Sequence, residues 1–270
     1  MTVTANCPAY VTGIFTIGDG DAAGAGFSID KGLSTSVSEK KGGMTTITIN
    51  GVQTPSPVSK AVLRRFFEIC GKVGLLEIRH ETEIPIGYGL GMSAAGALSL
   101  SLALNELLGA GLKRNECVKI AHDSDVECGT GLSGVDAAAI GGMLARRSVV
   151  DAPVKMKFEE KEIEIAFFSP IRTSSIIRSE EWKAKVNKAG DDCLEELFRN
   201  RKWDGFVSAS RKFALESGLA AWCGSEMEKN DRASMAMLGQ TLFSDTPLKL
   251  SRAPLKIIRT KTCEAGAELV

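Results

Sequence analysis

The sequence predicts an α+β protein, in which strands and helices both contribute to the core. Residues 45–52 (TTITINGV) alternate apolar and polar side chains, and residues 74–83 do so in part, as half-buried strands do. Residues 94–108 have almost no charge and no proline, which is typical of a buried helix. Residues 179–219 have the charged amphipathic pattern of surface helices.

The first half of the chain contains most of the predicted strands. We expect a strand near residues 10–17, a loop at 18–26, and a second strand that ends near residue 37. Two prolines precede a helix predicted at 60–72, and Gly109 to Gly111 end the buried helix. A further helix is predicted at 115–127.

The second half has a different charge pattern after Arg146-Arg147. Residues 155–168 are typical of a hairpin or strand pair, residues 170–177 of a strand that leads into a loop, and residues 246–270 of a closing strand and tail. Asp151-Ala152-Pro153 marks a boundary, so we expect two lobes, residues 1–150 and 151–270.

Composition excludes several classes of function. The 33 basic and 33 acidic residues balance, so nothing favours a nucleic-acid or membrane-surface partner, and a small-molecule substrate is expected. The seven cysteines are scattered, which fits free thiols in the cytoplasm better than disulfides or zinc. No stretch is typical of a signal peptide or a transmembrane helix.

A glycine-rich segment, Pro85 to Gly96, lies between a predicted strand and the buried helix. Glycine lets the backbone approach a ligand closely, and a helix N-terminus presents free N–H groups and a partial positive charge. This combination favours a phosphate site to which Ser93 adds a hydroxyl. The alternative is a tight connection with Ser93 as an N-cap.

Two other motifs have weaker interpretations. Asp19 and Asp21 lie among four glycines and would suit a cation or a polar substrate, or a solvated hairpin loop. Gly129, Gly131 and Gly134 spell a dinucleotide fingerprint, but they follow a charged helix instead of a strand, which argues against NAD.

Phosphoryl transfer from ATP needs a phosphate cradle, oxygen ligands for Mg²⁺ and a group that orients the accepting hydroxyl. Ser93 offers a hydroxyl, and the carboxylate candidates are Asp123, Asp125 and Glu127, each of which is alternatively a solvated surface acid. Asp136 lies in a stretch with no other charge and is the candidate for the hydroxyl-orienting base, or a helix N-cap.

The glycine-rich segment resembles Pro-x-x-x-Gly-Leu-Gly-Ser-Ser-Ala-Ala, the phosphate loop of the galactokinase, homoserine kinase, mevalonate kinase and phosphomevalonate kinase (GHMP) superfamily. Met92 replaces the first serine of this pattern. The resemblance implies an ATP site formed by Pro85, Gly87, Gly89, Leu90, Gly91, Met92, Ser93, Ala94 and Ala95. Residues 133–136 with Gly141-Gly142 are similar to the segment that carries the superfamily's catalytic aspartate, which implies Asp136 as base and Ser93 with Asp125 as Mg²⁺ ligands.

Four further stretches, residues 8–15, 24–26, 121–132 and 234–239, are most similar to the archaeal pantoate kinases. The resemblance implies a GHMP kinase fold with an N-terminal lobe like ribosomal protein S5 and a C-terminal ferredoxin-like lobe. It implies phosphorylation of (R)-pantoate to 4-phosphopantoate with ATP and Mg²⁺, a step toward coenzyme A, and a homodimer. Candidate substrate residues are Tyr10, Thr12, Gly24, Gly26, Thr130, Ser174 and Ser234.

The sequence is compatible with more than one acceptor. Tyr10 replaces the lysine of mevalonate kinase, and the order Ser133-Gly134-Val135-Asp136 is closer to mevalonate kinase than to pantoate kinases. The acceptor's carboxylate would contact a cation or hydroxyls; Arg172, Arg178, Lys31 and Arg232 are candidates, as are Thr173 and Ser175. Mevalonate or a mevalonate phosphate is the alternative acceptor, and a non-catalytic nucleotide-binding regulator is the alternative from another class.

Overall fold

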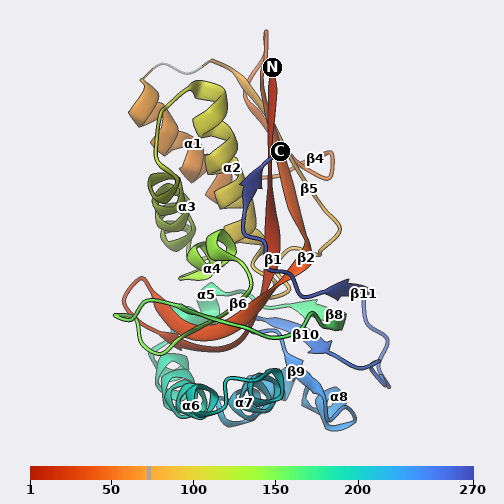
Figure 1. Ribbon diagram of the computed structural model, residues 1–270. Coiled ribbons are helices and arrows are strands. Elements are labelled where there is room, and N and C mark those ends of the chain that lie inside the picture. Colours follow the sequence, from red (N-terminus) through yellow and green to blue (C-terminus); the bar gives the residue numbers. More distant parts are fainter. Residues whose placement is uncertain (72–73) are drawn as a thin grey trace.

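Two long antiparallel strands run through the centre of the molecule (Figure 1). The computed structural model describes residues 1–71 and 74–270. Strand β1 (Thr2–Ile17) pairs with β2 (Ala22–Glu39) along almost its whole length. The register shifts between Pro8 and Ala9 and again between Thr12 and Ile14. Bulges bend a strand pair, and the lower parts of both strands curve away from the upper parts in Figure 1. These two strands therefore belong to both halves of the molecule.

The first sheet has the strand order β12-β1-β2-β5-β3-β4, and β6 pairs with β2 and with β7. Among its described strands, only β3 and β5 run parallel; the other neighbours are antiparallel. The remaining strands of this sheet are β3 (Thr46–Ile49), β4 (Val52–Gln53), β5 (Leu76–Thr82), β6 (Met143–Arg146), β7 (Val154–Met156) and β12 (Glu268–Leu269).

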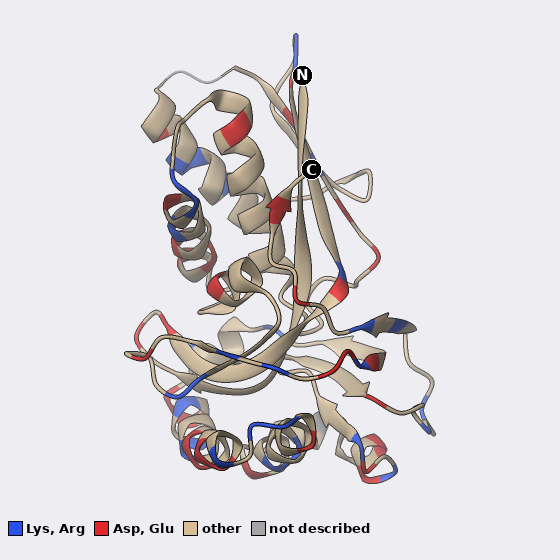
Figure 2. Cartoon of the chain, in the orientation of Figure 1, with Lys and Arg blue, Asp and Glu red and all other residues tan. Residues whose placement is uncertain are grey.

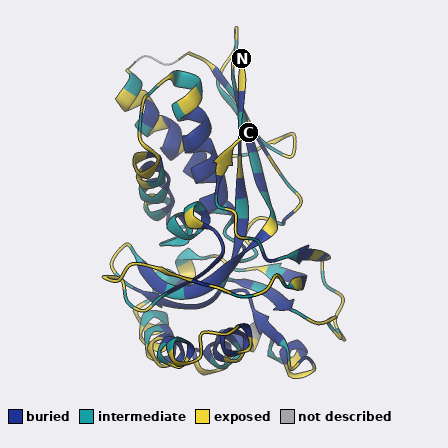
Figure 3. Cartoon of the chain, viewed as in Figure 1, coloured by how far each residue is buried: buried dark blue, intermediate teal, exposed yellow. Residues whose placement is uncertain are grey.

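Helices cover one face of the upper part of this sheet: α1 (Pro57–Cys70), α2 (Met92–Leu108), α3 (Arg114–Cys128) and α4 (Gly134–Ile140). Helix α2 packs on β1 and β2 and is flanked by α1 and α3. Its single charged residue is Glu106, and Figure 3 shows most of the helix buried. The near absence of charge explains why this helix occupies the centre of the layer.

The second sheet has the antiparallel order β11-β8-β10-β9. Numbered along the chain this is 4-1-3-2, the order of a ferredoxin-like sheet, with a non-helical segment at 245–255 where the second helix of that motif would lie. Its strands are β8 (Glu162–Pro170), β9 (Ala233–Met235), β10 (Gly239–Ser244) and β11 (Lys256–Lys261).

The crossover between β8 and β9 is helical: α5 (Ser174–Ile177), α6 (Glu180–Arg199), α7 (Trp203–Glu216), η1 (Leu219–Trp222) and α8 (Gly224–Glu228). Helices α6 and α7 pack under the bent part of β1. Both signs of charge are interspersed over these two helices in Figure 2, as expected of their solvated faces.

The predicted α+β class and GHMP kinase fold are confirmed, with differences in detail. The expected loop at 18–26 is shorter, because β2 begins at Ala22 and pairs with the end of β1. Residues 155–168 do not form a strand pair: β7 pairs with β6, and β8 pairs with β10 and β11. The interpretation of residues 170–177 as strand and loop misses α5.

Two predicted boundaries, the end of the first helix and the division into lobes, are not tested by the structure. Lys72, the expected end of the first helix, lies outside the described residues. The division into lobes at residue 150 stays a prediction. None of the helices in the described part of the chain combines the length and apolar character needed to cross a bilayer.

Candidate active site

The glycine-rich segment forms a loop from the end of β5 to the first turn of α2, beside a cavity of about 530 Å³. Gly87, Gly89 and Gly91 have φ values of 88°, 84° and 68°, a region that glycine enters without strain. Gly91 caps α2, so Ser93 lies inside the helix and is not its N-cap. The free N–H groups at the start of α2 therefore face the glycine-rich loop beside the cavity.

The loop is fastened by segments from far along the chain. Tyr10 N donates to Leu90 O at 3.2 Å and Ile171 N donates to Gly87 O at 3.2 Å. The Thr241 hydroxyl donates to Tyr88 O at 2.8 Å. Residues 236–239 lie against Gly89 so closely that a Cβ there would stand 2.5 Å from Met237 O. The conformation of the loop thus depends on both sheets.

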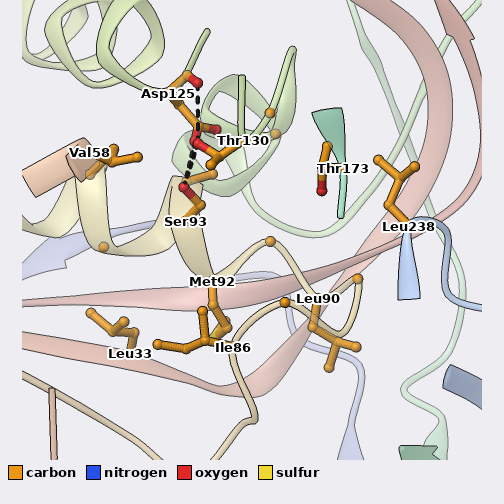
Figure 4. Close-up of a pocket in the computed structure, with 18 of the residues that line it drawn as sticks. Leu33, Val58, Ile86, Leu90, Met92, Ser93, Asp125, Thr130, Thr173 and Leu238 are labelled. Carbon is orange, nitrogen blue, oxygen red and sulfur yellow. Dashed lines mark hydrogen bonds between the residues drawn. The ribbon is translucent and has the colours of Figure 1, made fainter. Parts of the chain in front are cut away.

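Ser93, Asp125 and Thr130 form a polar cluster inside the cavity (Figure 4). Ser93 Oγ donates to Asp125 Oδ1 at 2.6 Å and lies 3.0 Å from Thr130 Oγ1, which also donates to Asp125. Asp125 is only 1% exposed. Burial raises the pKa of its carboxyl group, and the hydrogen bonds from Ser93 and Thr130 oppose that rise.

This cluster fits a magnesium ion. It combines one carboxylate with two hydroxyls, the oxygen donors that Mg²⁺ takes while it retains several waters. Gly131 leaves space beside the carboxylate, since a Cβ there would stand 2.1 Å from Asp125 Oδ2. The described residues include no group of three or more His, Cys, Asp or Glu that would suit another metal.

The two other candidate acids of α3, Asp123 and Glu127, point away from the cavity. Asp123 pairs with Lys119 at 3.0 Å, and Glu127 pairs with Arg64 and Arg65. Among the three candidates from the sequence, the fold therefore brings only Asp125 to Ser93.

Asp136 is the third residue of α4, which is capped by Ser133, so it is not an N-cap. Its Oδ2 lies 3.6 Å from Nδ1 of His122, a buried nitrogen with no hydrogen-bond partner in the described structure. Burial raises the pKa of Asp136; His122 and Arg146 oppose the rise, while Asp21 adds to it. Arg146 itself pairs with Asp21 at 2.8 Å. Asp136 is half-exposed and lines a neighbouring hollow with His122.

Comparison with known proteins identifies the family of the chain. Residues 57–142 match the model of the GHMP kinases N-terminal domain. The pantoate kinase of Methanocaldococcus jannaschii is 31% identical over 269 residues, which cover 93% of this chain and 96% of that protein. The chain belongs to the pantoate kinase family of GHMP kinases.

A second relative and a solved structure agree with this family and with its fold. The pantoate kinase of Methanospirillum hungatei is 29% identical to this kinase over 90% of the chain and 86% of its own length. A solved structure described as "Phosphotransferase related to CoA biosynthesis pathway" has a TM-score of 0.84 at 21% identity, with 100% of this chain and 99% of that chain covered. At this identity the likeness shows the fold.

Some of the other candidate residues of the kinase line the cavity, and others do not. From the proposed ATP segment, residues 87 and 89–94 line the cavity, whereas Pro85 and Ala95 do not. Thr12 and Thr130 line it as well. Tyr10 is 7% exposed and its hydroxyl lies in the interior, where burial raises its pKa.

The remaining substrate candidates lie outside the cavity. Gly24 and Gly26 allow β2 to pack closely against β1, because a Cβ on either would stand 2.3 Å from a carbonyl oxygen of β1. Ser234 is fully buried in β9 and its hydroxyl has no hydrogen-bond partner in the described structure. Ser174 begins α5, but Thr173 and Ile177 are the neighbours that reach the cavity.

Among the four candidate cations for the acceptor, two are engaged elsewhere. Lys31 pairs with Glu83, and Arg232 pairs with Asp204 and Asp245. Arg172 and Arg178 form no ion pair with any described residue. Arg178 lies over Gly129, where a Cβ would stand 2.4 Å from its Nη2.

The two ends of the cavity were not indicated by the sequence. Leu238 lines one end with the uncommon φ of 66° for a residue that is not glycine. At the other end lie the start of α1, Leu33, Ile49 and His80. A helix start after Pro55 and Pro57 was visible in the sequence, but nothing in the sequence indicated that it faces the phosphate loop.

Proposed function

We propose that this kinase transfers the γ-phosphoryl group of ATP to the 4-hydroxyl of (R)-pantoate, giving 4-phosphopantoate for coenzyme A synthesis. The buried cluster of Ser93, Asp125 and Thr130 at the start of α2 is the observation that supports nucleotide phosphate binding most directly. The full-length likeness to pantoate kinases supports the acceptor.

In this proposal the phosphate loop and the first turn of α2 hold the nucleotide phosphates through backbone N–H groups. Ser93 and Asp125 would hold Mg²⁺, which when bound neutralises charge on the transferring phosphoryl group. Burial of Asp125 strengthens this interaction, because few waters compete for its carboxylate.

Asp136 orients the accepting hydroxyl and takes its proton. Its raised pKa brings the carboxylate closer in basicity to neutral pH, which favours general-base catalysis. Arg172 and Arg178 are the unpaired cations proposed for the acceptor's carboxylate, with Thr173 as a hydroxyl donor at the cavity wall.

The test is release of ADP from Mg²⁺-ATP with pantoate, mevalonate, homoserine, shikimate or galactose. We expect turnover on pantoate, with 4-phosphopantoate as the product. Turnover on mevalonate alone would overturn the acceptor and leave a GHMP kinase. ATP binding with no turnover on any acceptor would favour the non-catalytic regulator.

We also propose a cytoplasmic location, a homodimer and no nucleic-acid partner, in line with the balanced charge of the chain. Light scattering on the purified protein tests the dimer.

A further inference from the structure

The end of the cavity beyond Ser93 is mostly apolar. Leu33, Ile49, Val58 and Ala97 line it, and Figure 4 shows Leu33 and Val58 on the opposite side of Ser93 from Thr173 and Leu238. Ser59 and His80 also line the cavity and are 7% and 2% exposed. A flat, apolar ring would fit this end, with Ser59 as its polar contact.

The side chains of Ser59 and His80 belong to a continuous buried chain of hydrogen bonds. Ser59 Oγ lies 3.0 Å from His80 Nε2, and His80 Nδ1 lies 2.8 Å from Thr35 Oγ1. Thr35 Oγ1 lies 2.6 Å from Ser99 Oγ, which lies 2.7 Å from Ala95 O in the first turn of α2. The chain therefore links α1, β5, β2 and α2.

The direction of every hydrogen bond in this chain follows from its last member. Ala95 O is a carbonyl and can only accept, so the single hydroxyl proton of Ser99 must point to it. Ser99 then accepts from Thr35, and Thr35 accepts from His80, whose Nδ1 carries the proton. The bare Nε2 accepts from Ser59. Burial lowers the pKa of His80 to about 4, so the ring is neutral near pH 7.

This direction decides what Ser59 presents to the cavity. Ser59 donates its one hydroxyl proton to His80 Nε2, so only the lone pairs of its oxygen remain for a ligand. A ligand N–H group can therefore donate to Ser59 Oγ. A ligand carbonyl oxygen in the same place would face Ser59 Oγ with no proton between the two acceptors.

We propose that Ser59, held as an acceptor by the His80–Thr35–Ser99 chain, reads the exocyclic amino group of the nucleotide base and makes the kinase select adenine over 6-oxopurines. This rests on the proposed function, since it assigns the apolar end of the cavity to the base of the phosphoryl donor. Ser59 acts as the specificity-determining residue, and His80, Thr35 and Ser99 act as positioning residues.

The direction of the chain is tested by ¹⁵N NMR of the histidine rings. The protein has only two histidines, so a His122→Gln variant assigns the signals. We expect His80 with a protonated Nδ1 and a bare Nε2 at pH 7.5. The opposite tautomer would overturn the proposal, whatever the enzyme's acceptor.

Base recognition is tested by calorimetric binding of ATP and inosine triphosphate without acceptor, which separates it from catalysis. We expect ATP to bind at least 10-fold more tightly, the scale of one hydrogen bond replaced by an unpaired acceptor. Equal binding overturns the inference alone, whereas binding of neither nucleotide overturns the proposed function with it.

Two variants and a matched control complete the test. Ser59→Ala should reduce the preference for ATP below 3-fold. Ser99→Ala should reverse the ring tautomer and turn the Ser59 proton to the cavity, with the same loss of preference and without a change in the cavity wall. Ser101→Ala removes another buried hydroxyl of α2, which donates to Cys117 O at 2.9 Å, and should keep the wild-type preference. A reversed tautomer in Ser99→Ala with an unchanged preference for ATP would contradict the proposal.

Discussion

Asp125 differs from Asp123 and Glu127 in the direction in which α3 presents its side chain. It is buried beside Ser93, whereas Asp123 is solvated and pairs with Lys119. A buried carboxylate is costly unless it is hydrogen-bonded or meets a cation. The burial and raised pKa of Asp125 thus fit its proposed role as a Mg²⁺ ligand.

Asp125→Asn should lower kcat by about 100-fold, the range seen when one electrostatic group of a site is removed. The apparent affinity for Mg²⁺ should fall, because a neutral amide binds the ion weakly. The measurement is ADP release as a function of Mg²⁺ at fixed ATP. Asp123→Asn is the matched control and should behave as wild type; equal losses in both variants would remove Asp125 from its proposed role.

Asp136→Asn should lower kcat by two to four orders of magnitude while ATP binding is preserved, if Asp136 takes the proton of the acceptor. The raised pKa of Asp136 predicts that wild-type activity declines on the acid side at a higher pH than an ordinary aspartate would give. Initial rates between pH 4.5 and 8 measure both effects. An unchanged kcat in the variant would exclude this residue as the base.

At the scale of elements, the phosphate loop joins the two sheets. Its backbone is held by residues 10, 171 and 241, and residues 236–239 pack directly on Gly89. The loop is therefore shaped by the second sheet as much as by its own glycines.

Gly89→Ala should weaken ATP binding and destabilise the fold. Alanine at φ 84° costs about 1–2 kcal/mol, and the added Cβ would stand 2.5 Å from Met237 O, which forces the two segments apart. The KM for ATP and the urea midpoint measure the two effects.

Gly51→Ala is the control for this prediction. Gly51 has a φ of 77° but no atom within 4 Å of an added Cβ, so it keeps the strain and lacks the clash. We expect this variant to lose stability and keep the wild-type KM for ATP. A KM that rises equally in both variants would show that the contact with Met237 is unimportant.

At the scale of the whole molecule, the buried His80 makes folding depend on pH. An unfolded histidine titrates near pH 6.5, and burial lowers the pKa of His80 to about 4 in the folded state. Between these values the unfolded chain binds the extra proton, so stability falls as the pH decreases from 6.5 toward 4.

The loss that His80 contributes between pH 7.5 and 5.5 should be about 1 kcal/mol. Urea unfolding at both pH values, compared between wild type and His80→Gln, isolates it from the titration of His122 and the carboxyl groups. The variant should show a smaller decrease in stability on acidification. An identical decrease in both proteins would mean that His80 is protonated in the folded state as readily as in the unfolded one.

Features that depend on neighbouring residues could be predicted from the sequence. The glycines at 87, 89 and 91, the uncharged helix after them and the α+β class follow from local spacing and hydrophobic pattern, and the α+β class and GHMP kinase fold are confirmed. The likeness to pantoate kinases was also present in the linear motifs.

Which side chains meet at the cavity depends on the packing of elements that are distant in the sequence. The orientation of α3 separates Asp125 from Asp123 and Glu127, and the packing of α1, β2, β5 and α2 assembles Ser59, His80, Thr35 and Ser99. Residues 59 and 99 contribute to one hydrogen-bond chain because their elements pack together, which no local pattern encodes. The same reason explains why the sequence indicated a phosphate site and did not indicate the end of the cavity that we assign to the base.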